Sequence, residues 1–131
     1  MTQITLAVTG SISAYKAADI TSQLTKLGLE VKVLMTPAAR KFITPLTLQV
    51  LSKNPVGLDV MIEEDPKRIE HIDIGKETDL FLVAPASANT IAKLAMGLAD
   101  NMVTSTALAL PQGTKKILAP AMNTKMLEHP A

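Results

Sequence analysis

Four stretches of the chain are strongly apolar, at positions 4–9, 29–35, 80–84 and 116–119. Short apolar runs of this kind are typical of strands that are buried on both faces of a parallel sheet. Between the first two runs, Ile20, Leu24 and Leu27 recur at spacings of four and three and form the apolar stripe of a helix. The pattern therefore predicts an α/β fold, a doubly wound parallel sheet with helices on both faces.

Caps and turn formers indicate where the helices lie. Thr36-Pro37 and Thr44-Pro45 each place a hydroxyl before a proline, which is typical of a helix start. Gly28 and Gly97 are expected to follow helix ends. The expected helices cover residues 15–27, 38–42, 46–51 and 90–96, and a last one opens at Asp100-Asn101 with Met102, Val103, Thr106 and Leu110 on its inner face.

The middle of the chain is less regular. Residues 56–61 alternate in polarity and predict a half-buried third strand. Residues 62–70 are charged, contain Pro66 and predict a surface loop that leads to His71. Because a single histidine beside apolar neighbours is more often structural than catalytic, the residues alone leave the role of His71 open.

The turn after the first strand is small and rich in hydroxyls, with Gly10, Ser11 and Ser13. The dinucleotide fingerprint needs three glycines and an acidic residue about 20 positions further on. This turn has one glycine, and the second strand ends in Thr36 without an acid. The pattern favours a terminal monophosphate, as in FMN, over NAD or FAD. The alternative is that Ser11 or Ser13 only caps the following helix.

A second turn of the same chemistry follows the strand at residues 80–84. It is built of small residues, with polar groups on Ser87 and Asn89, and Asn89 can cap the next helix. Thr36 lies at the same edge of the sheet, as a ligand contact or as a plain N-cap. Because ligands of open α/β sheets bind beyond the carboxyl ends of the strands, we expect these turns to lie together.

Composition narrows the class of protein. The 131 residues are expected to form one domain, residues 1–131, and the net charge of +1 gives no sign of a nucleic-acid or membrane partner. The chain has no cysteine, so it offers no disulfide, thiolate metal site or cysteine nucleophile, and no metal site is predicted. The absence of cysteine and of an apparent signal peptide fits a cytoplasmic protein.

The order and spacing of six motifs resemble the flavin-dependent cysteine decarboxylases, which have a flavodoxin- or Rossmann-like fold. The most specific is the signature Pro-x-Met-Asn-x-x-Met, present here at residues 120–126. The other matching segments are residues 9–16, 35–43, 71–72, 84–90 and 97–101. The resemblance extends over essentially the whole chain.

This resemblance implies a set of site residues. His71 and Asn123 match the catalytic histidine and the asparagine that engages the substrate carboxylate, and Ala121 and Met122 accompany Asn123 at the substrate. The residues implied to hold FMN are Gly10, Ser11, Ser13, Thr36, Phe42, Ala86, Ser87, Asn89, Met102 and Ser105.

The resemblance also implies a reaction. A cysteinyl carboxylate cannot simply lose CO2, because the carbanion left behind has no electron sink. Oxidation of its CH2–SH group to a thioaldehyde by FMN creates the sink, and the reduced flavin returns the electrons after CO2 has left. The motifs are closest to the branch that converts 4'-phosphopantothenoylcysteine to 4'-phosphopantetheine in coenzyme A biosynthesis. Its members are homo-oligomers, trimers or dodecamers, with FMN between subunits and a fused or separate ligase.

The sequence also departs from the family. A cysteine on a substrate-covering segment, downstream of the signature in relatives, has no counterpart in these residues, and Leu127 replaces the usual tryptophan. Two alternatives within the family stay open: an FMN-binding regulatory subunit, and a decarboxylase of C-terminal peptidyl-cysteine. The related flavin prenyltransferases lack the Pro-x-Met-Asn signature and are disfavoured.

Overall fold

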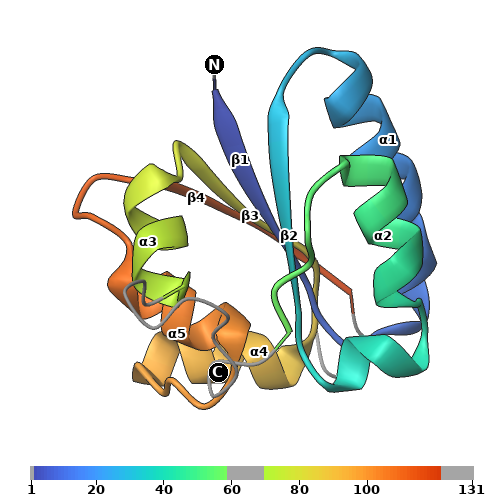
Figure 1. The fold of residues 1–131 in the computed structure, drawn as a ribbon. Coiled ribbons are helices and arrows are strands. Elements are labelled where there is room, and N and C mark those ends of the chain that lie inside the picture. The colour runs from blue at the N-terminus through green and yellow to red at the C-terminus, as the bar shows by residue number, and fades with distance from the viewer. Residues whose placement is uncertain (1, 59–69, 122–131) are drawn as a thin grey trace.

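A four-stranded parallel sheet forms the centre of the protein (Figure 1). The computed structural model describes residues 2–58 and 70–121, and for residues 70–73 the backbone alone. The strands are β1 (Gln3–Val8), β2 (Glu30–Met35), β3 (Leu80–Ala86) and β4 (Lys115–Pro120), in the spatial order β2-β1-β3-β4. All three strand pairs are parallel, so the four apolar runs predict the sheet correctly.

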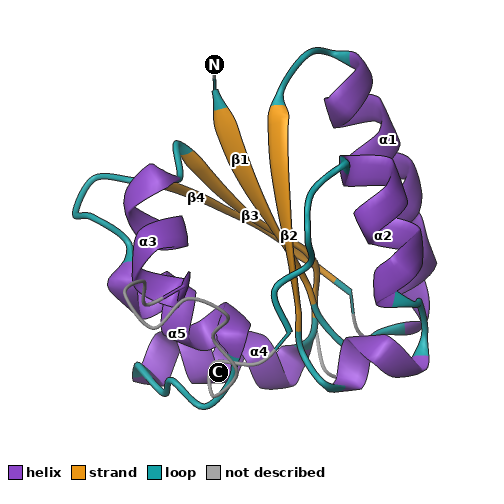
Figure 2. Ribbon diagram, in the orientation of Figure 1, coloured by secondary structure: helices purple, strands orange, loops and turns teal. Residues whose placement is uncertain are grey.

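Helices cover both faces of this sheet, as Figure 2 shows, which confirms the doubly wound α/β fold. Helices α1 and α2 lie on one side, and α3, α4 and α5 on the other. Their bounds are η1 (Ile12–Tyr15), α1 (Lys16–Lys26), η2 (Ala38–Lys41), α2 (Pro45–Ser52), α3 (Glu70–Glu77), α4 (Ala88–Met96) and α5 (Met102–Ala109). Within the described residues, no helix has the length and apolarity needed to cross a bilayer.

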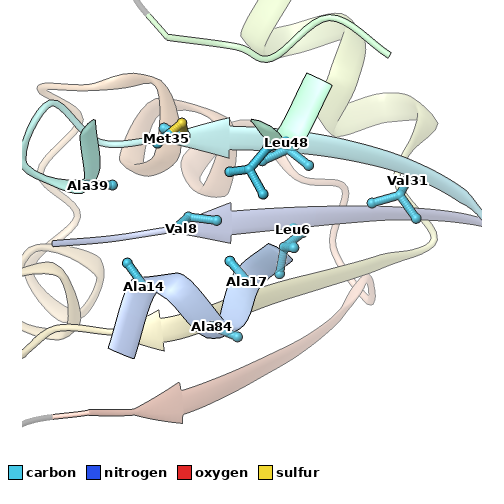
Figure 3. Close-up of a cluster of buried hydrophobic side chains, with 10 residues drawn as sticks. Leu6, Val8, Ala14, Ala17, Val31, Met35, Ala39, Leu48 and Ala84 are labelled. Atoms are coloured by element: carbon cyan, nitrogen blue, oxygen red, sulfur yellow. The ribbon is translucent and has the colours of Figure 1, made fainter. Parts of the chain in front are cut away.

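The sheet divides the buried core into two clusters. Leu6 and Val8 of β1 belong to the cluster on the α1–α2 side, where Leu48 packs from α2 (Figure 3). Ala7, between them in sequence, belongs to the opposite cluster with Met102 and Val103 of α5. This arrangement follows from the alternation of side chains along a strand. By contrast, β4 at the sheet edge is exposed along its whole length.

The expected strand at residues 56–61 is not found in its described part. Gly57 alone pairs with β2, through an isolated bridge to Leu34, and residues 59–61 lie outside the described residues. Pro55, two residues earlier, has no N–H with which to extend a ladder. Val56 and Leu58 instead pack against the α1–α2 cluster, which explains their apolar alternation.

Helix starts also differ from the expectation at two places. The helix expected at residues 15–27 is found as α1, which begins one residue later and is preceded by η1. Helix α4 begins at Ala88, and its N-cap is Ser87 rather than Asn89. The expected ends are correct, since Gly28 and Gly97 adopt positive φ angles of 85° and 73°.

Candidate functional site

A cleft of about 540 Å³ lies at the carboxyl edge of the sheet, and the loops that follow all four strands contribute to it. The strand order reverses between β1 and β3, so this is the position at which open α/β sheets bind ligands. The lining residues are Gly10, Ser11, Thr36, Pro37, Ala38, Ser87, Ala88, Asn89, Thr90, Lys93, Asp100, Asn101 and Ala121.

The turn after β1 approaches the turn after β2 very closely. A Cβ atom on Gly10 would lie 2.6 Å from Cβ of Ala38, so only glycine permits this approach. Ser11 is the N-cap of η1, and its Oγ accepts a hydrogen bond from the N–H of Ser13 at 3.2 Å. The capping interpretation of Ser11 is therefore correct, yet its hydroxyl hydrogen stays available to a ligand in the cleft.

The loop after β3 presents the start of α4 to the cleft. Oγ of Ser87 accepts a hydrogen bond from the N–H of Thr90 at 3.2 Å and caps the helix. The N–H groups of Ala88 and Asn89 find no acceptor among the described residues. Unpaired N–H groups at a helix start, with the partial positive charge of the helix dipole, favour an anion such as phosphate.

Thr36 makes a hydrogen bond of the capping type and also faces the cleft, where its contact with a ligand stays a prediction. It lines the cleft at the end of β2, and its Oγ1 accepts a hydrogen bond from the N–H of Ala39 at 3.2 Å. As with Ser11, accepting this bond leaves the hydroxyl hydrogen free to donate.

A charged pair that sequence reasoning missed forms part of the wall. Nζ of Lys93 lies 2.8 Å from Oδ2 of Asp100. The hydrogen bond from Lys93 is the main cause that lowers the pKa of Asp100 below its ordinary value of 3.8. Lys93 follows Asn89 by one helical turn, and this i, i+4 spacing was the available signal. Asn101, which was predicted to open the last helix but was not named as a site residue, caps α5 by accepting from the N–H of Thr104 at 2.9 Å.

The structure brings together six of the residues expected at the site: Gly10, Ser11, Thr36, Ser87, Asn89 and Ala121. Five others are outside this lining: Ser13, Phe42, Ala86, Met102 and Ser105. Met102 is fully buried in the core cluster on the α5 side, and Phe42 is 47% exposed. Met122, Asn123 and the side chain of His71 lie outside the described residues, although the backbone of His71 is part of α3.

The lining is suited to a phosphate monoester with an uncharged body. It offers hydroxyls and backbone N–H groups beside the small side chains of Ala38, Ala88 and Ala121, and the Lys93 ammonium is paired with the Asp100 carboxylate of the same lining. Among the described residues, no group of three or more His, Cys, Asp or Glu side chains is placed to hold a metal ion.

Comparison with known proteins assigns this architecture to a family. The sequence pattern of the family described as Flavoprotein matches residues 1–131. The chain belongs to the Flavoprotein family. A probable phosphopantothenoylcysteine decarboxylase of Streptococcus mutans is 67% identical over 128 residues, which cover 98% of this chain and 72% of the relative.

A second sequence relative and a solved structure are also similar to this chain. The coenzyme A biosynthesis bifunctional protein CoaBC of Bacillus subtilis is 48% identical over 98% of this chain, which spans 31% of that relative. The crystal structure of the FMN-dependent cysteine decarboxylase TvaF from thioviridamide biosynthesis superposes with a TM-score of 0.90 at 33% identity, covering 99% of this chain and 79% of TvaF. The resemblance to flavin-dependent cysteine decarboxylases is thereby confirmed.

Proposed function

We propose that this flavoprotein decarboxylates 4'-phosphopantothenoylcysteine to 4'-phosphopantetheine with FMN, as a cytoplasmic step of coenzyme A biosynthesis. The observation that carries the proposal is the 67% identity, over 98% of the chain, to a probable phosphopantothenoylcysteine decarboxylase. The bifunctional CoaBC relative suggests a ligase as partner, fused or separate.

The cleft fits the phosphate end of FMN. Ser11 and Thr36 have hydroxyl hydrogens to donate, and Ala88 and Asn89 have backbone N–H groups that are unpaired within residues 2–58 and 70–121. The turn after β1 has a single glycine and β2 is followed by a threonine, so neither feature provides for a second nucleotide.

FMN, His71 and Asn123 have separate proposed roles in the reaction. Bound FMN supplies two-electron oxidation of the substrate CH2–SH group and returns both electrons after CO2 has left. His71 acts as acid or base, because an imidazole can exchange a proton near neutral pH. Asn123 donates its amide N–H to the substrate carboxylate, without a positive charge that would oppose CO2 loss. Ala121 lines the cleft two positions before Asn123.

Homo-oligomeric assembly, as a trimer or dodecamer with FMN between subunits, belongs to the proposal. Exposed apolar side chains on segments that directly follow cleft residues support it. Ile12 is 81% exposed and Tyr15 61% exposed after Gly10 and Ser11, and Phe42 is 47% exposed after η2. Contact with a neighbouring subunit would bury these side chains beside the cofactor.

Two measurements test the proposed function. The ligand released from the purified protein by heat is identified by mass and visible spectrum, and FMN is expected. The protein is then incubated with 4'-phosphopantothenoylcysteine or with a peptide that ends in cysteine, and loss of CO2 is followed by mass. The similarity to the peptidyl-cysteine decarboxylase EpiD, with a TM-score of 0.82 at 32% identity, makes a peptide the second candidate substrate. A protein that binds FMN but decarboxylates neither substrate favours the regulatory alternative.

A further inference from the structure

Thr9, between β1 and Gly10, connects the two loops that line the cleft. Its Oγ1 donates a hydrogen bond to the carbonyl oxygen of Pro85 at 2.6 Å. Oγ1 of Thr9 also accepts a hydrogen bond from the N–H of Ser87 at 2.8 Å. The two loops are 76 to 78 positions apart in sequence, and the side chain of Thr9 has no exposed surface.

The second of these bonds affects the start of α4 directly. It turns the N–H of Ser87 towards the protein interior, while the next two N–H groups, of Ala88 and Asn89, have no acceptor in the part of the chain that the structure describes. The Thr9 hydroxyl thus sets the position of the first turn of α4 relative to Gly10 and Ser11. A hydroxyl has one hydrogen to donate and lone pairs to accept, so one side chain can make both bonds.

We propose that Thr9 is a positioning residue of the FMN site, which holds the loop after β1 and the loop after β3 at the separation that the cofactor's phosphate end requires. The inference rests on the proposed binding of FMN in this cleft. Thr9 is outside the cleft lining, so its effect on the cofactor acts through Ser87 and Gly10.

The chain contains a matched control for this residue. Thr5 lies on β1, the strand that leads into Thr9, and is equally buried. Its Oγ1 forms a hydrogen bond of 2.6 Å with Oγ1 of Thr78. Thr78 stands just before β3, at the amino end of that strand, and neither threonine lines the cleft. Thr5 therefore connects β1 to the β3 region in a similar way, but at the end away from the cofactor.

The experiment compares the Thr9→Val, Thr9→Ser and Thr5→Val variants of the purified protein, freed of cofactor and titrated with FMN by quenching of flavin fluorescence. Thr9→Val removes both side-chain hydrogen bonds at nearly constant volume, while the backbone N–H of Thr9 keeps its hydrogen bond of 3.3 Å to the carbonyl oxygen of Pro85. The variant is expected to raise the FMN Kd about tenfold or more. Thr9→Ser keeps the hydroxyl and should stay within about threefold of the parent, and Thr5→Val within about twofold. Melting temperatures are recorded in parallel, because both valine variants are expected to lose stability.

Equal FMN affinity of Thr9→Val and the parent would overturn the inference, as would an equal loss of affinity in Thr5→Val. If Thr9→Val does not fold, Thr9→Cys replaces it, since a thiol forms only weak hydrogen bonds; an unchanged Kd there counts against the inference in the same way. A parent protein that binds no FMN would overturn the proposed function and the role of Thr9 together.

Discussion

Small side chains at single positions decide how close the loops of the cleft approach. Gly10 and Ala38 meet where the loops after β1 and β2 converge, and no side chain larger than these fits between them. A substitution at this contact acts on the site through space rather than through a lost hydrogen bond.

Gly10→Ala is expected to displace η2 from the turn after β1, because the new Cβ would lie 2.6 Å from that of Ala38. We expect a lower melting temperature and an FMN Kd raised about tenfold or more. The double variant Gly10→Ala with Ala38→Gly removes the clash and should recover most of the affinity. Failure of the second change to restore binding would show that Gly10 acts in another way.

His71→Asn tests the proposed acid or base. Asparagine cannot exchange a proton near neutral pH, so the variant should retain bound FMN and its visible spectrum while turnover of 4'-phosphopantothenoylcysteine is abolished. Product formation is measured by mass, with cofactor content as the control for folding. A normal rate of decarboxylation in this variant would contradict the assignment of His71.

Lys93→Met tests the electrostatics of the cleft wall. The Lys93 hydrogen bond is the main cause of the lowered pKa of Asp100, so the substitution should raise that pKa towards 3.8. A titration of the Asp100 carboxyl carbon by NMR measures the change. Because folding lowers the pKa of Asp100, its pair with Lys93 stabilises the protein at pH values above the unfolded-state pKa. This stabilisation is lost as the pH falls through the folded-state pKa. An unchanged pKa in Lys93→Met would assign the shift to the Asp100 backbone and Thr104.

At the scale of elements, β1 and β3 were predictable because burial on both faces imposes apolar runs such as residues 80–84. The start of β2 alternates between buried and half-buried residues, and β4 is exposed along its whole length. Helix α3 was not predicted, since it contains a glycine and charged residues. The reason for Gly75 lies in its tertiary contact: a Cβ there would lie 3.2 Å from the carbonyl oxygen of Ala109 at the end of α5. The sequence contains no local sign of that contact.

The candidate site was predictable to a similar extent. Turn residues at strand ends, such as Ser87, could be found from local chemistry and from the family resemblance. The spacing of Lys93 from Asn89 was a local signal for Lys93, but its pairing with Asp100 could not be found, because that contact joins α4 to the segment before α5 and depends on how the chain turns at Gly97. Thr9 was missed because its partners lie on another strand.

Two buried threonines on helices should respond to valine in opposite directions. Oγ1 of Thr104 accepts hydrogen bonds from the N–H groups of Asp100 and Asn101, each at 3.1 Å, and completes the capping box of α5. Thr104→Val should lower the free energy of unfolding by about 1–2 kcal/mol. Oγ1 of Thr21 in α1 is buried without a partner in the described structure. Thr21→Val should therefore raise the free energy of unfolding by up to about 1 kcal/mol. Chemical denaturation measures both, and a stability loss in Thr21→Val would indicate a partner for its hydroxyl.

At the scale of the whole molecule, the loops of the site depend on a sheet with core on both sides. Neighbouring residues of one strand belong to different clusters, as Leu6 and Ala7 do on β1. The backbone of the sheet lies between these clusters, so side chains of one do not interdigitate with side chains of the other.

This separation can be measured with three leucines. Leu48 and Leu6 share the α1–α2 cluster, while Leu34 belongs to the opposite one, and all three are fully buried. Each Leu→Ala substitution is expected to lower the free energy of unfolding by about 2–5 kcal/mol. The losses for Leu48 and Leu34 should add within about 0.5 kcal/mol, whereas those for Leu48 and Leu6 should deviate from the sum. Strong coupling of Leu48 with Leu34 would contradict this.

The two-compartment core affects how the amino-acid sequence can change during evolution. A core in two separate compartments allows side-chain volumes to change on one face of the sheet without compensating changes on the other. The layer that contains α1 and α2 and the layer that contains α5 can therefore accumulate substitutions as independent sets. Residues at the strand ends, such as Gly10 and Thr9, are constrained from both sides, because the loops from both layers meet there at the cleft.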